Sequence, residues 1–210
     1  MRFMLDFLLL PLFLHVLPLG APEAPRPAAA VVRQTPAPAK ELLTWSASRP
    51  LTWADFKGRP NTGDPLHALT TANIGAQIGC QDYVFSANVQ ATFTPTESWV
   101  KSPHTESAAL LHHEQVHFDL TEVHARQLRQ KLKTLKFDCE HLQPAFNNVM
   151  KVAIANWQRE QQRYDVDTNH GLNLIKQKTW DDQVLQRLTA LQAYAAPAPA
   201  AAGTASSSGQ

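Results

Sequence analysis

The sequence predicts an α+β fold, in which an N-terminal antiparallel sheet is followed by about three helices. Apolar and polar residues alternate over residues 72–78 and 83–93, the period of half-buried strands. Beyond Trp99 the pattern changes, and residues 107–135 contain neither Gly nor Pro, as expected for a long helix. Strands gathered before helices are typical of α+β domains.

The two predicted strands should form a hairpin. Residues 79–82, Gly-Cys-Gln-Asp, separate the alternating runs and suit a turn. In the second run one face carries only apolar residues, which we expect to cover the core: Tyr83, Phe85, Ala87, Val89, Ala91 and Phe93.

Three helices are expected after the sheet. Ser102 followed by Pro103 suits a helix N-cap and first position, and within residues 107–135 four leucines fall on one side, Leu110, Leu128, Leu132 and Leu135. We expect a second helix at about residues 144–164 and a third at about 172–194. The connections between them are residues 137–142 and 165–171.

The ends of the chain differ in composition from the middle. Residues 1–24 predict a signal peptide or N-terminal anchor, because an apolar run of signal-peptide length follows Arg2. Residues 25–40 are rich in Pro and Ala and predict a linker, and residues 195–210 predict a disordered tail. We therefore expect an exported protein, periplasmic or extracellular, whose folded domain at residues 41–194 does not span a membrane.

The net charge bears on possible partners, and the cysteine content bears on a possible disulfide. The net charge of +1 gives no reason to expect nucleic acid as a partner. The two cysteines, Cys80 and Cys139, predict a disulfide in an exported chain, with two free buried thiols as the alternative. Because the bond would close a long loop, it would stabilise the fold by about 4 kcal/mol in the chain-entropy model.

A His-Glu-x-x-His motif lies within the first predicted helix. His113 and His117 are separated by about 40° around the helix and by one turn along it, so both imidazoles can reach one zinc ion. Glu114 lies beside the pair, about 100° from His113, where a carboxylate can act as general base on a water molecule. The motif predicts a zinc site that activates water.

A catalytic zinc site needs a third protein ligand. On the same helix Glu122 faces away from the pair, and His124 lies about 10 Å beyond His117 along the axis. An antiparallel second helix returns to the level of His117 near residues 162–165, which leaves His170 and Asp165 as candidates, with Glu160 a weaker one. Glu140 and His141 fall at the far end and are excluded by the same arithmetic.

Four segments resemble a known family. They are residues 51–58, residues 98–100, residues 111–119 with Glu122 and residues 125–126, and residues 164–165 with 168–170, Gln177 and Trp180. Together they resemble the bacterial family of predicted secreted zinc-dependent proteases, which is catalogued as a domain of unknown function. The resemblance implies a zincin-like peptidase with metal ligands His113 and His117 and catalytic Glu114, and it favours His170 as the third ligand.

The leading hypothesis is an exported zinc metallopeptidase that cleaves peptide or protein substrates. Strand 83–93 could then offer its edge to an extended peptide, and Tyr164 is either a core residue or an oxyanion donor. A non-catalytic exported zinc protein is the second hypothesis, in which a fourth ligand closes the site. An envelope scaffold with an accidental motif is the third. Glu122 and Arg126 are expected to form an exposed ion pair.

Overall fold

The computed structural model describes residues 41–60 and 63–196. The chain divides into two units, residues 1–38 and 39–210, and every described residue belongs to the second. The expected signal peptide and linker lie outside the described residues, as does nearly all of the expected tail. Within the described part, no helix is long and apolar enough to cross a membrane.

The described part is an α+β domain, as predicted. Short elements come first: β1 (Leu43–Thr44), the 3-10 helix η1 (Trp53–Asp55) and β2 (Ala68–Leu69). The long strands β3 (Ala72–Gln81) and β4 (Val84–Phe93) and the short strand β5 (Trp99–Val100) follow. The helices are α1 (Ala108–Thr134), α2 (Leu142–Thr168) and α3 (Leu174–Ala190), with the 3-10 helix η2 (Gln192–Tyr194) after them.

Strands β3 and β4 form a long hairpin, but its turn is not where the sequence pattern placed it. Residues 79–81 continue β3, and the turn is made by Asp82 and Tyr83, whose φ angles are 50° and 62°. Two residues with positive φ match the right-handed twist of a hairpin, which explains how this pair can turn the chain without glycine. Tyr83 therefore leaves the inner face and is 79% exposed.

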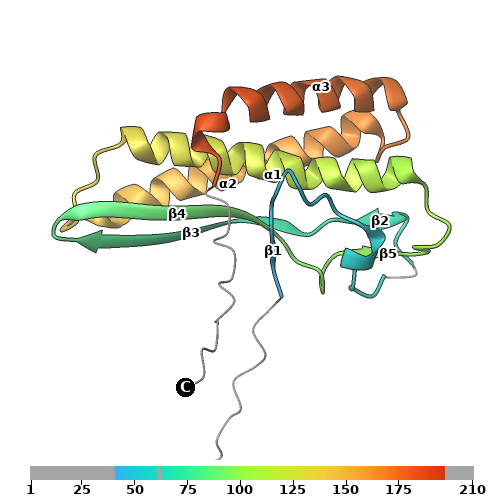
Figure 1. The fold of residues 1–210 in the computed structure, drawn as a ribbon, viewed down its shortest axis with the longest axis horizontal. Coiled ribbons are helices and arrows are strands. Elements are labelled where there is room, and N and C mark those ends of the chain that lie inside the picture. Colours follow the sequence, from blue (N-terminus) through green and yellow to red (C-terminus); the bar gives the residue numbers. More distant parts are fainter. Residues whose placement is uncertain (1–40, 61–62, 197–210) are drawn as a thin grey trace, which may run out of the picture. The chain divides into compact units, whose positions relative to one another are not determined.

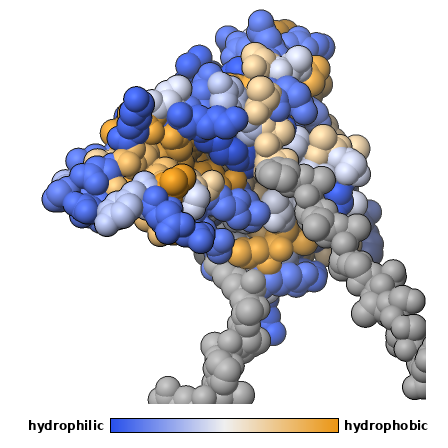
Figure 2. Space-filling model, turned by 60° about the vertical axis from the view of Figure 1, so that its left-hand side comes forward, coloured by the Kyte–Doolittle hydropathy of each residue, from blue (hydrophilic) through white to orange (hydrophobic). Residues whose placement is uncertain are grey.

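The hairpin presents its apolar face to the helices. Phe93 is fully buried, and its ring lies 5.2 Å from that of Phe56 and 5.8 Å from that of Phe118 on α1. Helix α1 packs on both β3 and β4, and α3 packs on α1 and α2 (Figure 1). Each large apolar side chain buried in this way stabilises the fold by roughly 1.5–3 kcal/mol. Seen from the side that carries the β3–β4 turn, hydrophilic residues lie at the left and top of the molecule, and hydrophobic residues are visible between and below them (Figure 2).

The sheet order decides which strands have a free edge. Strand β4 lies in the middle of a three-stranded sheet, between β1 and β3, while β2 and β5 form a separate pair. On its second edge β4 pairs with β1 only at Thr92 and Phe93, so the rest of that edge has no strand partner among the described residues. The suggestion that residues 83–93 offer an edge to a peptide therefore stays a prediction.

The helices differ from the predicted ones at their ends. Helix α1 begins at Ala108, where the Ser107 side chain accepts the N–H of Leu110, so Ser102 is not its N-cap. The Ser102 carbonyl instead accepts the N–H groups of Thr105 and Glu106 in a preceding turn. Helix α2 runs to Thr168 and is capped by Asn169 in the left-handed conformation. Asp165 is therefore in the last turn of a helix rather than in a loop.

The predicted disulfide between Cys80 and Cys139 is confirmed, with 5.9 Å between the two Cα atoms. It joins the end of β3 to the loop between α1 and α2. Both elements lie at the end of the domain where the hairpin turns (Figure 1).

Candidate metal centre

His113 and His117 present their Nε2 atoms to the same point. Both lie on α1, one turn apart, and the two Nε2 atoms are 3.2 Å from each other. The His113 side chain is 2% exposed and that of His117 is 13% exposed. The pair therefore faces the protein interior next to α2, where side chains of the second helix meet it.

Asp165 completes a three-atom set. Its Oδ1 atom lies 3.2 Å from His113 Nε2 and 3.0 Å from His117 Nε2. Two ligand atoms at the usual distance from a tetrahedral zinc ion are about 3.4 Å apart. The three separations are thus close to those of a zinc site. The extension of α2 beyond residue 164 is what brings this carboxylate to the pair.

His170 stands beside the set rather than at its centre. Its Nδ1 atom is 3.3 Å from Asp165 Oδ1, and its side chain is half exposed. His113, Asp165 and His170 each offer a ligand atom within 4.8 Å of the other two. Both sequence candidates for the third ligand are therefore at the site, and Asp165 makes the shorter contacts to the histidine pair.

A turn of residues in the left-handed conformation places His170 beside Asp165. The φ angles of Asn169, His170 and Gly171 are 49°, 52° and 84°, so three consecutive residues have positive φ. Gly171 is needed there for a second reason: a Cβ on it would lie 3.0 Å from His113 Cβ. The turn after α2 consequently packs directly against the first motif histidine.

Two glutamine side chains determine the tautomers of the motif histidines. Gln161 Oε1 is 2.6 Å from His117 Nδ1, while its amide nitrogen donates to the His117 carbonyl at 2.9 Å. Because the nitrogen is committed to a carbonyl acceptor, the oxygen faces the imidazole and accepts its Nδ1–H. A neutral His117 then carries a free lone pair on Nε2, the form that binds a metal.

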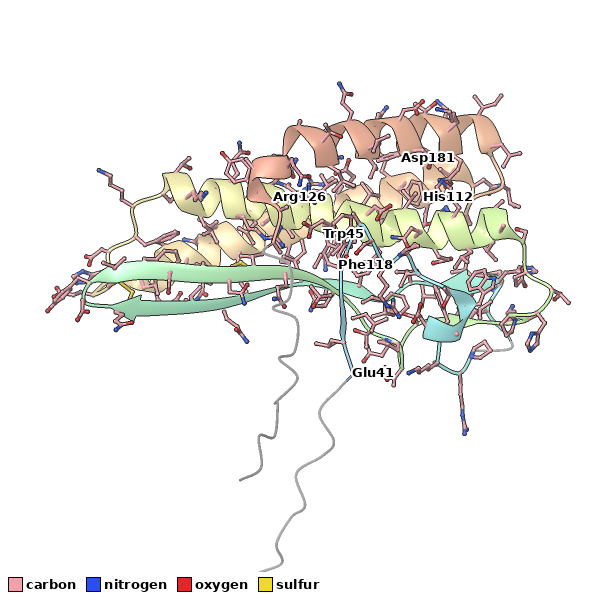
Figure 3. All side chains as sticks on the ribbon, in the orientation of Figure 1. Glu41, Trp45, His112, Phe118, Arg126 and Asp181 are labelled. Carbon is pink, nitrogen blue, oxygen red and sulfur yellow. A yellow bond between two sulfur atoms is a disulfide. The ribbon has the colours of Figure 1, made fainter. Side chains whose placement is uncertain are left out.

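Gln177 does the same for His113. Its Oε1 atom is 3.3 Å from His113 Nδ1 and accepts the Tyr164 hydroxyl at 2.9 Å, while its amide nitrogen donates to Asp181 Oδ1 at 2.9 Å. The His113 lone pair is therefore also on Nε2. Asp181 on α3 in turn faces His112 on α1, with 3.0 Å between His112 Nε2 and Asp181 Oδ1 (Figure 3).

Tyr164 has a supporting role and does not offer its hydroxyl to a substrate. It is fully buried, and its ring stacks on that of His113 at 4.7 Å. Its hydroxyl donates to Gln177 Oε1 at 2.9 Å, and the His113 carbonyl oxygen lies 3.2 Å away on the same side. Burial is the main cause that raises the pKa of Tyr164, so the hydroxyl stays protonated.

The ionisation of the site shows that it favours a positive charge. Burial raises the pKa of Asp165, but hydrogen bonds to His113 and His117 outweigh burial and hold the pKa well below 3.8. Burial lowers the pKa of His117, but Asp165 and Glu114 outweigh it and hold the pKa above 6.5. Since Nδ1–H is already used, a hydrogen bond to Asp165 requires a second proton on an imidazole. A metal ion at the same point would satisfy all three atoms at once.

Glu114 is the buried acid of the motif. It is 3% exposed. Among the described residues, its Oε2 is the one buried side-chain nitrogen or oxygen atom that has no hydrogen-bond partner. An unpartnered buried carboxylate oxygen is costly, and such an atom calls for a functional explanation. A water molecule held at the metal centre would supply the missing donor. The residues present therefore fit a hydrated zinc ion.

The other acidic candidates have different partners. Glu160 accepts from His124 at 2.6 Å and from Arg187 at 2.6 Å, so its carboxylate is committed to ion pairs. Glu122 and Arg126 do pair at 2.8 Å, but the expectation that they are exposed is wrong, since their side chains are 2% and 3% exposed. Buried charges of this kind require partners, and Arg129 also binds Glu122.

A large cleft opens onto the centre. Its volume is about 1130 Å³, and it is lined by residues 65–72, the N-terminal part of α1, the C-terminal part of α2 and the turn leading to α3. His113, Glu114, His117, Asp165 and His170 all line it. Residues 65–72 were not identified from the sequence, because no periodic pattern marks them and their place in the cleft depends on pairing with β5.

Comparison with known proteins gives a family but no activity. The model of a family described as "Bacterial protein of unknown function (DUF922)" matches residues 53–171, more than half of the chain. This range includes the motif histidines, Glu114, Asp165 and His170. No curated protein and no solved structure matches the chain.

Proposed function

The chain belongs to the DUF922 family of bacterial proteins, whose function is unknown, and on that premise we propose that it is a zinc-dependent peptidase. The observation that carries the proposal is the convergence of three acceptor atoms, His113 Nε2, His117 Nε2 and Asp165 Oδ1, beside the unpartnered Glu114 Oε2. Three protein ligands with an adjacent general base are typical of catalytic rather than structural zinc sites.

His113, His117 and Asp165 would hold the ion. Two neutral imidazoles and a carboxylate are a donor set that zinc accepts, and the glutamines keep both imidazoles in the required tautomer. When bound, zinc supplies a Lewis acid that polarises a carbonyl and lowers the pKa of water to about 7.

Glu114 would carry the proton through the reaction. Its Oε2 atom accepts a proton from the attacking water as the water oxygen forms a bond to the scissile carbonyl carbon. As the carbon–nitrogen bond breaks, the same carboxyl group passes that proton to the leaving amine. The immediate products are a carboxylic acid and an amine, and Glu114 returns to its starting state. Transfer of the second water proton from the acid to the amine then leaves a carboxylate and an ammonium group.

Replacing Glu114 by Gln tests the proposal. Glu114→Gln keeps the shape of the side chain but cannot accept the proton, so we expect zinc content to remain at one ion per chain and peptide hydrolysis to fall by at least about 100-fold. Glu140→Gln, at an exposed acid outside the cleft, is the matched control and should retain full activity. Unchanged hydrolysis by Glu114→Gln would reject Glu114 as the general base.

A non-catalytic zinc protein is the second candidate, and the position of His170 is the observation that favours it. If His170 were a fourth ligand, the site would be closed and no hydrolysis would follow. We expect His170→Ala to bind zinc as tightly as the wild type, because the His170 side chain is half exposed and lies beside Asp165, with 3.3 Å between Nδ1 and Oδ1. A large loss of zinc affinity, measured by competition with a chelator, would support the closed site instead.

We also propose that the protein works outside the cytoplasm. The disulfide supports this, since such bonds persist in oxidising compartments. N-terminal analysis of the protein from fractionated cells tests the proposal. A processed chain in the periplasm or medium is expected, and an unprocessed chain confined to the cytoplasm would contradict it.

A further inference from the structure

The cleft beside the metal centre is slightly larger than an ordinary small-molecule pocket. Pockets for small molecules usually measure about 300–1,000 Å³, and this cleft holds about 1130 Å³. It extends from the centre in α1 and α2 to the strand segment 65–72 on one side and to the start of α3 on the other. A substrate that fills it must therefore reach well beyond the scissile bond.

The two walls of the cleft are apolar. Leu69 and Leu110 line it on the side of β2 and α1, and Leu172 and Leu174 line it on the side of the turn and α3. Leu172 is 77% exposed and Leu174 is 66% exposed. Large apolar side chains that gather in the open beside a site usually mark a surface that binds apolar groups.

Two further apolar side chains close in sequence to the cleft residues are exposed. Val166 is 78% exposed and follows Asp165 on α2, and Ile175 is 81% exposed and follows Leu174 on α3. These residues are adjacent in sequence to cleft residues.

The cleft lining has few charged side chains away from the metal centre. Among the described residues that line it, the acids are Glu106, Glu114 and Asp165, and none is Lys or Arg. The acids at the centre would be balanced by a divalent ion, and Glu106 lies 3.0 Å from His67. The described lining therefore offers no Lys or Arg to hold a C-terminal carboxylate, and its one acid away from the metal centre, Glu106, already has His67 as a hydrogen-bond partner.

We infer that the substrate of this site is an uncharged, apolar stretch in the interior of a polypeptide, and that the enzyme is an endopeptidase. This inference rests on the proposed peptidase function. Leu172 and Leu174 are the residues that would hold apolar side chains of the substrate, opposite Leu69. They are specificity residues and take no part in moving protons.

The first test uses internally quenched peptides with both ends blocked. For the zinc-loaded full chain, we expect the largest kcat/KM for peptides with apolar residues around the cleaved bond. Placing Asp or Lys at the positions beside that bond should lower kcat/KM roughly tenfold or more. Unblocking either end of the peptide should bring no gain.

The second test changes the cleft wall. Leu172→Asp and Leu174→Asp replace exposed side chains, so the fold should persist, and each should lower kcat/KM for the apolar peptide about tenfold with zinc content unchanged. Val152→Asp is the matched control, since Val152 is 51% exposed and lies outside the cleft. It should leave kcat/KM unchanged.

The outcomes separate the two claims. Hydrolysis that prefers charged flanking residues, that releases single residues from an end, or that is insensitive to both leucine changes would overturn the inferred substrate and leave the peptidase intact. Failure of the zinc-loaded chain to cleave any peptide, blocked or unblocked, apolar or charged, would overturn the proposed function and the inferred substrate with it.

Discussion

At the scale of single residues, the two glutamines matter as much as the ligands. A histidine can place its proton on either nitrogen, and a metal site needs the lone pair on the inward nitrogen. Gln161 and Gln177 remove the choice, because their own amide nitrogens are held by the His117 carbonyl and by Asp181. Residues of α2 and α3 thereby hold the two histidines of α1 in the tautomer that binds a metal.

Replacing these glutamines should weaken zinc binding. Gln161→Leu and Gln177→Leu remove the Nδ1–H acceptor, and we expect each to lower zinc affinity by roughly 10–100-fold in a chelator competition. Gln158→Leu, at a glutamine that also lines the cleft, serves as control. If the leucine variants bind zinc like the wild type, the tautomers are not held by these contacts.

Gly171 is the second residue whose identity the site fixes. Gly171→Ala adds a Cβ 3.0 Å from His113 Cβ at a φ of 84°, so it is strained twice. We expect a loss of about 1–3 kcal/mol in the free energy of unfolding, together with weaker zinc binding. Gly75→Ala, where the nearest atom is 4.0 Å away, should have little effect on zinc binding. Equal zinc affinity in the two variants would show that the turn does not position His113.

At the scale of elements, Glu160 connects all three helices. It lies on α2, accepts from His124 on α1 at 2.6 Å, and binds Arg187 on α3 at 2.6 Å. Burial raises the pKa of Glu160, but these partners outweigh it and lower the pKa to about 2. The carboxylate therefore helps to keep α2 at the level where Asp165 meets the motif.

This pKa shift predicts how the fold responds to acid. Because the folded-state pKa is below the ordinary value of 4.5, the stabilisation is complete above pH 4.5 and disappears as the pH falls towards about 2. The contribution is roughly 2 kcal/mol. Glu160→Gln should remove it, so that urea unfolding midpoints of this variant fall less between pH 5 and pH 3 than those of the wild type.

Asp82→Asn is the control for that measurement. Asp82 lies in the exposed hairpin turn, and Asn also tolerates its positive φ. This variant should follow the wild-type dependence on pH. A wild-type slope that Glu160→Gln leaves unchanged would assign the acid sensitivity to another group.

At the scale of the whole molecule, counting residues along two antiparallel helices located the segment beside His117, whereas the ends of the helices and the hairpin turn were predicted less well. Antiparallel helices rise at the same rate, so counting residues from His117 led to the segment that holds Asp165 and His170. The count could not show that α2 continues through Asp165, because this depends on Asn169 adopting a left-handed cap. The hairpin turn was likewise predicted too early in the chain, because Asp82 and Tyr83 also adopt a positive φ that their residue types do not announce.

Contacts between segments that are distant in the sequence could not be predicted from local patterns. Nothing in the local pattern pairs Gln177 with His113, or places residues 65–72 along the cleft. The buried Glu122 and Arg126 looked like a surface pair because their spacing of four residues is the same in either setting. Burial depends on η2 and α3 closing over them, and the carbonyl of Leu188 confirms that closure by accepting from Arg126 at 2.6 Å.

The central claim is that His113, His117 and Asp165 hold one zinc ion. The most direct measurement is an anomalous difference map at the zinc absorption edge, from crystals of the zinc-loaded protein. The claim predicts a single strong peak about 2.0–2.2 Å from His113 Nε2, His117 Nε2 and an Asp165 carboxylate oxygen. No peak at this position, or a peak bound by other residues, would contradict it.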